Sequence, residues 1–210
     1  MRAHDNPKRR LAAILAIDLA GYSRMTERDE AGTLARLQAC RRDILNPAIR
    51  RRGGRVVKST GDGFLIEFPS AIDGVECAVE IQRVMQDMNA DAAGEPFTFR
   101  IGVNVGDLII EGADIFGDGV NIAARIEGLA TPGGVLISRT VRDQIRGKLP
   151  YEFVGRTDEA ETAMARVRDA QPKLLSVAVT TKRAFQAVSP RGQPYRDKFV
   201  RILIAAGVPD

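Results

Sequence analysis

Apolar runs of strand-like composition alternate along this chain with stretches of helical periodicity, and their order limits the folds open to it. An apolar run at 11–17 precedes one helical stretch, and a hairpin of runs at 55–58 and 64–68 precedes a second. A further strand begins at Phe97. The order β-α-β-β-α-β is typical of a ferredoxin-like sheet covered by helices. We therefore expect an α/β (α+β) fold with a ferredoxin-like βαββαβ core.

Both helical stretches are amphipathic. The first begins after Thr26, which can cap it together with Asp29, and extends to about Arg51. The second begins at Ser70, after Pro69 ends the hairpin. Apolar residues recur at steps of three and four: Leu34, Leu37, Cys40, Ile44 and Ala48 in the first stretch, and Ile72, Val75, Ala78, Ile81, Met85 and Met88 in the second.

A hairpin strand, a helix and a strand are appended to this core. We expect strands at 97–105 and 108–110 to pair around a turn at Gly106-Asp107. The elements that follow are a helix at 120–129 and a strand at 135–138. The domains we expect are a basic N-terminal tail at 1–10, one folded domain at 11–155 and an atypical, partly disordered C-terminal extension at 156–210, in which 174–179 could supply an edge strand.

Composition places the chain among globular proteins with one ordinary core. It has 210 residues, of which 44% are hydrophobic and 28% charged. The net charge of +4 suits an anionic ligand. The basic cluster at 50–52 lacks interleaved aromatic residues, so we expect a solvated basic face and no nucleic-acid partner.

Cysteine and histidine usage excludes several site classes. Cys40 and Cys77 lack metal-ligand spacing, so we expect buried thiols in a reducing cytoplasm. The single histidine, His4, argues against zinc catalysis and histidine triads. The basic residues 8–10 before the first apolar run imitate a secretory signal. That run spans only about seven residues, well short of the roughly 20 of a membrane span, so we expect no membrane segment and a cytoplasmic location.

Two aspartates stand where strands end. Asp18 follows the first apolar run, and Asp62 lies at the tip of the first hairpin, between Gly61 and Gly63. Taken singly, each is more simply explained as a turn residue. Brought together, the two carboxylates would repel each other unless cations lay between them, and a pair of divalent ions is common in phosphoryl-transfer sites.

A second pair of polar residues follows a glycine-rich loop. Asn121 and Arg125 are one helical turn apart and so share a helix face. An arginine on a rigid helix can stabilise charge on a phosphoryl group in transit. The alternative is a surface arginine paired with Glu127 or Asp118.

Four motifs occur in a specific order. They are Ala-Ile-Asp-Leu-Ala-Gly-Tyr-Ser around Asp18, Lys-Ser-Thr-Gly-Asp-Gly around Asp62, Arg-Ile-Gly-Val-Asn-Val-Gly-Asp from Arg100, and Asp-Ile-Phe-Gly-Asp-Gly-Val-Asn-Ile-Ala-Ala-Arg from Asp114. In this order the chain resembles the class III nucleotidyl cyclases, in particular bacterial adenylate cyclase catalytic domains. The resemblance runs from about residue 11 to 154. It implies the fold of that catalytic domain and the conversion of ATP to 3′,5′-cyclic AMP and pyrophosphate.

The resemblance also implies roles for individual residues and a partner. The site would form between two chains in a head-to-tail homodimer, with ATP as substrate and two divalent cations, Mg²⁺ or Mn²⁺, as cofactors. The implied roles are metal binding for Asp18, Asp62 and the backbone carbonyl of Leu19, base selection for Lys58 and Asp114, and contact with ribose and transition-state phosphate for Asn121 and Arg125.

Base selection has a physical reason of its own. Adenine offers an acceptor at N1 and a donor at its 6-amino group, and guanine offers the reverse. Lys58 can only donate and an ionised Asp114 can only accept, so the pair complements adenine and disfavours a guanylate cyclase.

The C-terminal part departs from the family pattern. After the strand expected at 151–153, residues 155–162 match no family segment, and no motif places the lysine that would hold the triphosphate. The departure favours an alternative: a catalytically weak or inactive cyclase-like module that binds nucleotide and dimerises in a regulatory role. Retention of all six site residues argues for the enzyme, because a purely structural domain gains nothing from a close pair of carboxylates.

Overall fold

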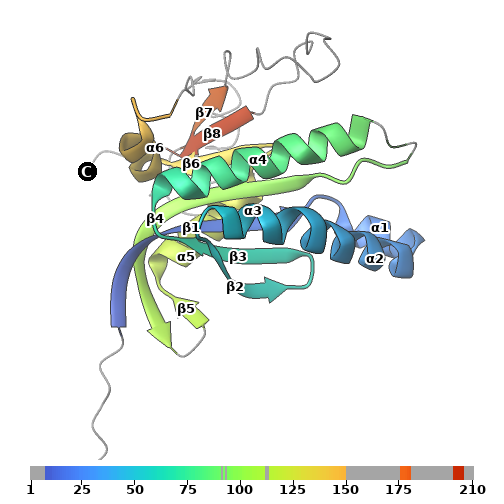
Figure 1. Cartoon of the computed structure of the whole chain (residues 1–210), viewed down its shortest axis with the longest axis horizontal. Coiled ribbons are helices and arrows are strands. Elements are labelled where there is room, and N and C mark those ends of the chain that lie inside the picture. The colour runs from blue at the N-terminus through green and yellow to red at the C-terminus, as the bar shows by residue number, and fades with distance from the viewer. Residues whose placement is uncertain are drawn as a thin grey trace, which may run out of the picture.

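The computed structural model describes residues 8–90, 92, 94–111, 114–149, 176–180 and 201–205. Figure 1 shows its helices and strands. In chain order they are β1 (Lys8–Leu19), α1 (Tyr22–Arg28), α2 (Glu30–Cys40), the π-helical turn η1 (Arg41–Leu45), α3 (Asn46–Arg51), β2 (Arg55–Thr60), β3 (Gly63–Phe68), α4 (Ala71–Ala90), β4 (Phe99–Glu111), β5 (Asp114–Phe116), α5 (Asp118–Leu129), β6 (Val135–Ser138), α6 (Arg139–Ile145), β7 (Ser176–Thr180) and β8 (Arg201–Ala205).

One sheet joins all the described strands. Its order is β2-β3-β1-β4-β6-β8-β7, with β5 paired to β4 outside this path. In the part of the sheet formed by β2, β3, β1 and β4, each strand is antiparallel to its neighbours. This order is that of a ferredoxin-like unit, so the expected fold is confirmed. Strand β6 then pairs parallel to β4, β8 pairs parallel to β6, and β7 forms the far edge.

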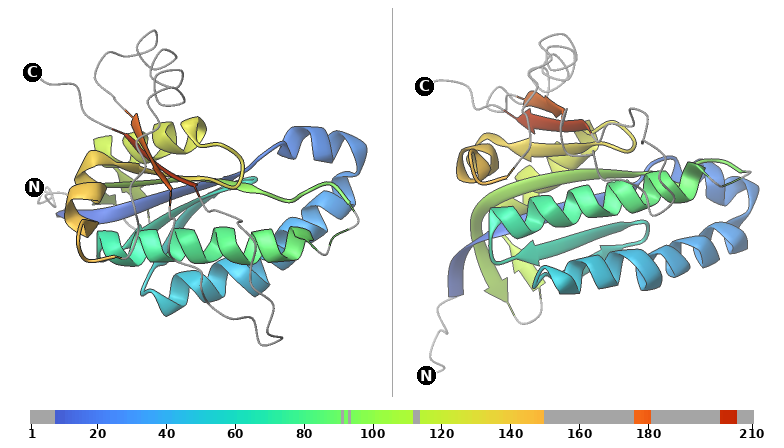
Figure 2. Two further views of the ribbon diagram at one scale, coloured as in Figure 1. Left: turned by 90° about the horizontal axis from the view of Figure 1, so that it is seen from above. Right: turned by 45° about the horizontal axis from the view of Figure 1, so that its top comes forward.

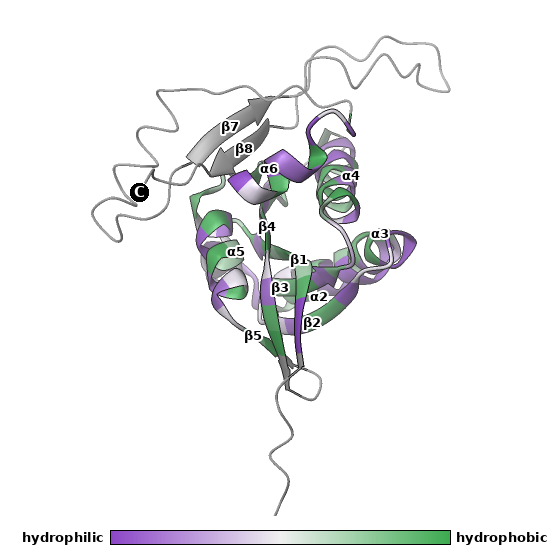
Figure 3. Cartoon of the chain, turned by 90° about the vertical axis from the view of Figure 1, so that its left-hand side faces the viewer, coloured by the Kyte–Doolittle hydropathy of each residue, from purple (hydrophilic) through white to green (hydrophobic). Residues whose placement is uncertain are grey.

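Helices cover both faces of the sheet. Seen nearly end-on, α5 lies on one side of β1 and β4, and α3 and α4 lie on the other (Figure 3). Figure 2 shows α4 beside the helical segment that ends in α3. Because β1 is buried on both faces, its apolar residues follow one another with no polar residue at every second position.

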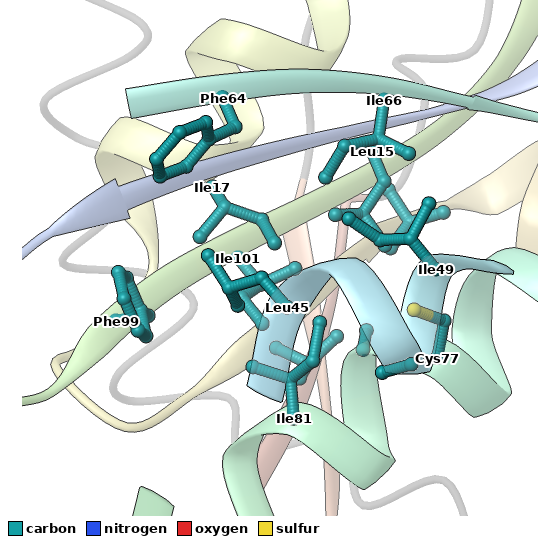
Figure 4. Close-up of a cluster of buried hydrophobic side chains, with 14 of the residues drawn as sticks. Leu15, Ile17, Leu45, Ile49, Phe64, Ile66, Cys77, Ile81, Phe99 and Ile101 are labelled. Carbon is teal, nitrogen blue, oxygen red and sulfur yellow. The ribbon is translucent and has the colours of Figure 1, made fainter. Parts of the chain in front are cut away.

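The larger core lies between the sheet and the helices α2 to α4. Leu15 and Ile17 of β1 contribute to it from one face of the strand, while Ile14 packs on the opposite face in a smaller cluster with α5. Figure 4 shows part of the larger core, including Cys77 of α4. Cys40 and Cys77 are both buried free thiols, and burial raises the pKa of each to about 12.

A single long strand replaces the strand pair that we expected around Gly106-Asp107, so that prediction was wrong. Strand β4 pairs with β1 without interruption from Ile110 to Phe99, and Gly106 pairs with Ala12 inside the ladder. The glycine serves packing, because a Cβ there would lie 2.9 Å from the Cα of Gly119 on α5. The hairpin lies further on, between β4 and β5.

Two element boundaries also differ from expectation. Strand β1 begins at Lys8, within the stretch expected to be a tail, and Arg10 there pairs with the buried carboxylate of Glu67. The N-cap of α2 is Asp29, whose side chain accepts a hydrogen bond from the Gly32 amide at 2.9 Å. Thr26, which we expected to share in this cap, lies inside α1. The apolar stripe of α4 ends before Met88, which is 51% exposed.

A buried glutamine connects α4 to the sheet. The side-chain amide of Gln82 donates to the carbonyls of Phe99 and Gly134, both at 2.8 Å. Phe99 begins β4 and Gly134 precedes β6, so this one side chain fixes both strands against α4. Within the described residues, no helix is both long enough and apolar enough to cross a membrane.

Candidate active site

The two predicted metal-binding carboxylates lie at neighbouring strand ends. Asp18 is the penultimate residue of β1, and Asp62 lies in the turn between β2 and β3. Gly61 in that turn has a φ of 75°, which favours glycine. A Cβ at Gly63 would lie 3.2 Å from the carbonyl oxygen of Ile17 and 3.8 Å from Asp18 Oδ1. The turn therefore sits directly against the end of β1.

The electrostatics of Asp62 reflect this proximity. Burial raises the pKa of the Asp62 carboxyl, and the charge and hydrogen bonding of Asp18 raise it further. A backbone hydrogen bond and the positive charge of Arg100 oppose the shift. A carboxyl group whose ionisation is disfavoured by burial and by a neighbouring carboxylate is the electrostatic condition that a bound cation relieves.

An arginine that we did not single out already contacts this pair. Arg100 of β4 is the cross-strand partner of Asp18, and its guanidinium Nη2 donates to Asp18 Oδ2. Its Nε lies 3.4 Å from Oε1 of Glu127 on α5. Burial, and then the charge of Asp18, raise the pKa of Glu127 to about 7 against the opposing effect of Arg100. The carboxylate pair is thus part of a four-residue charged cluster.

The sequence carried a weak signal for these two additional residues. Arg100 opens one of the four motifs, but nothing in its local context shows that it faces Asp18, because that depends on strand register. Glu127 was considered only as a partner for Arg125 on its own helix. It reaches Arg100 because α5 packs closely on Gly102, where a Cβ would lie 2.8 Å from the Glu127 Cα.

The donor set suits a metal that is shared with a substrate. The described residues contain no group of three or more histidine, cysteine, aspartate or glutamate side chains that could hold a metal ion by themselves. Two carboxylates with a backbone carbonyl, such as that of Leu19 at the end of β1, leave most coordination positions to other ligands. Mg²⁺ is commonly bound in this way, by one or two carboxylates and substrate phosphates. The residues present therefore fit such a cation.

The predicted base-selecting residues come from two strands that approach each other. Lys58 is exposed on β2, opposite Leu65 of β3. Asp114 is the first residue of β5, where its backbone pairs with Glu111, and strands β2 and β5 are in contact. The side chain of Asp114 lies outside what the structure describes, so its role stays a prediction.

The predicted ribose and phosphate residues lie on the exposed surface of α5. Asn121 and Arg125 are both exposed, one turn apart on the same helix face. In the described part of the chain, neither Glu127 nor Asp118 forms an ion pair with Arg125. The alternative of a paired surface arginine thus gains no support, because Glu127 faces Arg100.

Two cavities of the described part of the chain lie away from the predicted carboxylates. Cavities of about 430 Å³ between α2 and α4 and about 410 Å³ at the start of α5 are lined by neither Asp18 nor Asp62. Among the described residues, no hydrogen bond or ion pair joins the carboxylate pair to Asn121 or Arg125.

Comparison with known proteins adds independent information. The family model described as "Adenylate and Guanylate cyclase catalytic domain" matches residues 6–167. The chain is 48% identical over 153 residues to "Putative adenylate cyclase 3" of Rhizobium meliloti (strain 1021), covering 72% of this chain and 26% of that protein. It is 31% identical over 137 residues to "Adenylate cyclase" of Streptomyces coelicolor, covering 65% of this chain and 34% of that protein.

A solved structure gives the same picture at the level of the fold. An adenylate/guanylate cyclase/hydrolase from Silicibacter pomeroyi is 44% identical, with a TM-score of 0.68, over 72% of this chain and 88% of that chain. The chain spans only 26% and 34% of the two curated relatives, so it corresponds to one part of each.

Proposed function

The chain belongs to the family of adenylate and guanylate cyclase catalytic domains, and we propose that it is an adenylate cyclase that converts ATP to 3′,5′-cyclic AMP and pyrophosphate. The observation that carries this proposal is the position of the Asp62 turn against the end of β1, where the charge of Asp18 helps to raise the pKa of the Asp62 carboxyl. A domain that only bound a partner would gain nothing from such a pair of carboxyl groups.

In the proposed reaction the substrate's 3′ hydroxyl attacks its own α-phosphorus and pyrophosphate leaves. Asp18, Asp62 and the carbonyl of Leu19 would hold two divalent cations, Mg²⁺ or Mn²⁺, and the chemistry supplied there would be acidification of the hydroxyl and shielding of the phosphate charge. Arg125 offsets negative charge on the α-phosphoryl oxygens. Asn121 holds the ribose so that the hydroxyl lies in line with the phosphorus.

Selection of ATP over GTP falls to Lys58 and Asp114. Their strands approach each other beside the β4–β5 hairpin, and an ammonium donor with a carboxylate acceptor complements adenine. The names of the two curated relatives agree with this choice. A cytoplasmic location, where ATP is abundant, stays part of the prediction.

We further propose that the site is completed in a head-to-tail homodimer. Asn121 and Arg125 are exposed on α5, and neither of the two cavities described above is lined by the carboxylate pair. In the dimer, one protomer supplies Asp18 and Asp62, and its partner supplies the groups on α5, β2 and β5. Two equivalent sites result from the symmetry.

The test is product formation by the purified chain from ATP with Mn²⁺ or Mg²⁺, beside GTP and beside Asp62→Asn. We expect cyclic AMP from ATP, little product from GTP, and a loss of at least about a hundredfold with Asp62→Asn, an isosteric change that removes one metal-binding charge. Undiminished turnover by Asp62→Asn contradicts the metal assignment. Nucleotide binding without turnover by a folded dimer favours the regulatory module, whose support is the unplaced triphosphate lysine.

A further inference from the structure

Arg100 supplies a positive charge at the position where the proposed function calls for a metal cation. Its guanidinium donates to Asp18 from the neighbouring strand, at paired positions of the β1–β4 ladder. The Asp18 and Arg100 side chains are only 21% and 33% exposed, so solvent screens the interaction weakly. A cation that binds Asp18 must therefore compete with a guanidinium that is already in contact with it.

Glu127 offers that guanidinium a second carboxylate. Arg100 Nε and Glu127 Oε1 lie 3.4 Å apart, within ion-pair distance. Within the described residues, these two atoms are the buried side-chain nitrogen and oxygen atoms that lack a hydrogen-bond partner. Buried polar atoms without partners are uncommon, and here a donor and an acceptor face each other across a short gap. Arg100 thus donates to Asp18 through Nη2, while its Nε and the Oε1 atom of Glu127 each have room for a further hydrogen bond.

The backbone holds Glu127 in this place. Helix α5 lies on Gly102 of β4, two residues from Arg100, so closely that a Cβ at Gly102 would lie 2.6 Å from the Ala123 carbonyl oxygen. Glu127 is 15% exposed and does not pair with Arg125. Because the arginine donates its hydrogen bond to Asp18, the charge of the mostly buried Glu127 carboxylate is only partly compensated, which makes Glu127 a ready second partner for Arg100.

We propose that Arg100 is a built-in competitor of the divalent cation for Asp18, and that Glu127 receives the guanidinium when Asp18 takes up the metal. The exchange keeps the charge of the cluster compensated in both states: arginine on Asp18 without metal, arginine on Glu127 with metal. Arg100 and Glu127 are positioning residues, since both act through Asp18. This inference rests on the proposed function only in taking Asp18 as a metal ligand.

The test is the binding of Mn²⁺ to the nucleotide-free chain, measured by electron paramagnetic resonance of the free ion. The guanidinium and the cation compete for the same carboxylate, so we expect Arg100→Gln to tighten Mn²⁺ binding about tenfold. Arg139→Gln, which removes an equal charge from the exposed surface of α6, is the matched control and should leave the affinity unchanged.

A double-mutant cycle tests the part played by Glu127. With Arg100 present, Glu127→Gln should weaken Mn²⁺ binding several-fold, because the guanidinium then has no other carboxylate to move to. With Arg100→Gln already in place, the same change should alter the affinity less than about twofold. Equal effects in both backgrounds would mean that Glu127 acts only as a distant charge, and would overturn the exchange.

A spectroscopic readout on the unaltered chain guards against variants that fail to fold. The side-chain ¹⁵Nε–H resonance of Arg100 should shift on Mg²⁺ addition, as Nε gains Glu127 as its partner. No shift, or an unchanged or weakened Mn²⁺ affinity in folded Arg100→Gln, overturns the proposal. None of these measurements uses nucleotide, so they decide this inference even if the chain makes no cyclic AMP. If the chain makes cyclic AMP but the expected effects on metal binding are absent, this inference fails and the proposed function stands.

Discussion

Gly102 of β4 lies directly beneath Glu127 of α5, so closely that a Cβ on Gly102 would lie 2.8 Å from the Glu127 Cα. The distance is too short for any side chain at this position. The glycine therefore sets how near α5 can approach the sheet, and with it the positions of Glu127 beside Arg100 and of Asn121 and Arg125 on the outer face of the helix.

We expect Gly102→Ala to lower the free energy of unfolding by about 2–4 kcal/mol, because the methyl group meets backbone atoms that cannot move away without shifting α5. Urea denaturation followed by circular dichroism measures this change in the free energy of unfolding. The control is Gly128→Ala on α5, where a Cβ would have nothing within 4 Å. That change should be neutral, or stabilise the helix by up to about 1 kcal/mol. A Gly102→Ala protein as stable as the Gly128→Ala protein would contradict the close packing.

Glu127→Gln should stabilise the metal-free chain at alkaline pH. In the folded chain the pKa of Glu127 is raised from 4.5 to about 7, so the folded state holds its proton more tightly than the unfolded state. The raised pKa contributes to the free energy of unfolding in full below pH 4.5, and this contribution is lost as the pH rises through 7. The advantage of the glutamine variant should therefore grow by about 1–3 kcal/mol between pH 5 and pH 8.

Denaturation at several pH values in the presence of a chelator measures this difference. The chelator matters because a bound cation would favour the ionised carboxylates. A difference between the two proteins that is the same at pH 5 and pH 8 would show that Glu127 titrates normally.

Gln82→Met should lower the free energy of unfolding by about 1–3 kcal/mol. The methionine keeps the volume of the side chain but removes the amide that donates to the Phe99 and Gly134 carbonyls. Thermal unfolding of this variant should be compared with that of Gln38→Met, a change on the exposed face of α2 that we expect to be near neutral. Equal midpoints for the two variants would mean that the buried amide contributes no net stability.

The sequence predicted the core of this fold because local patterns and tertiary packing agree there. Strand β1 reads as an apolar run, since both of its faces are buried. The hairpin that carries Asp62 has glycine on both sides of its tip, and the structure seats that tip against Asp18.

Where the sequence misled, a tertiary contact was the reason. Gly106-Asp107 has the composition of a turn, yet Gly106 lies inside β4 because α5 packs against it at Gly119. The pairing of Arg100 with Asp18 depends on the register between β1 and β4, and the position of Glu127 depends on helix packing. Neither can be read from residue spacing along the chain.

The central claim, a metal site on one protomer completed by α5 of another, is tested most directly by mixing two inactive variants. Asp62→Ala should disable the metal-binding half and Arg125→Ala the phosphate-binding half. In a head-to-tail heterodimer one of the two sites is intact, so an equal mixture should recover about a quarter of the wild-type rate of cyclic AMP formation. The shared site would be contradicted by a mixture as inactive as either variant alone, provided that the wild-type chain is active and subunit exchange is shown to be complete.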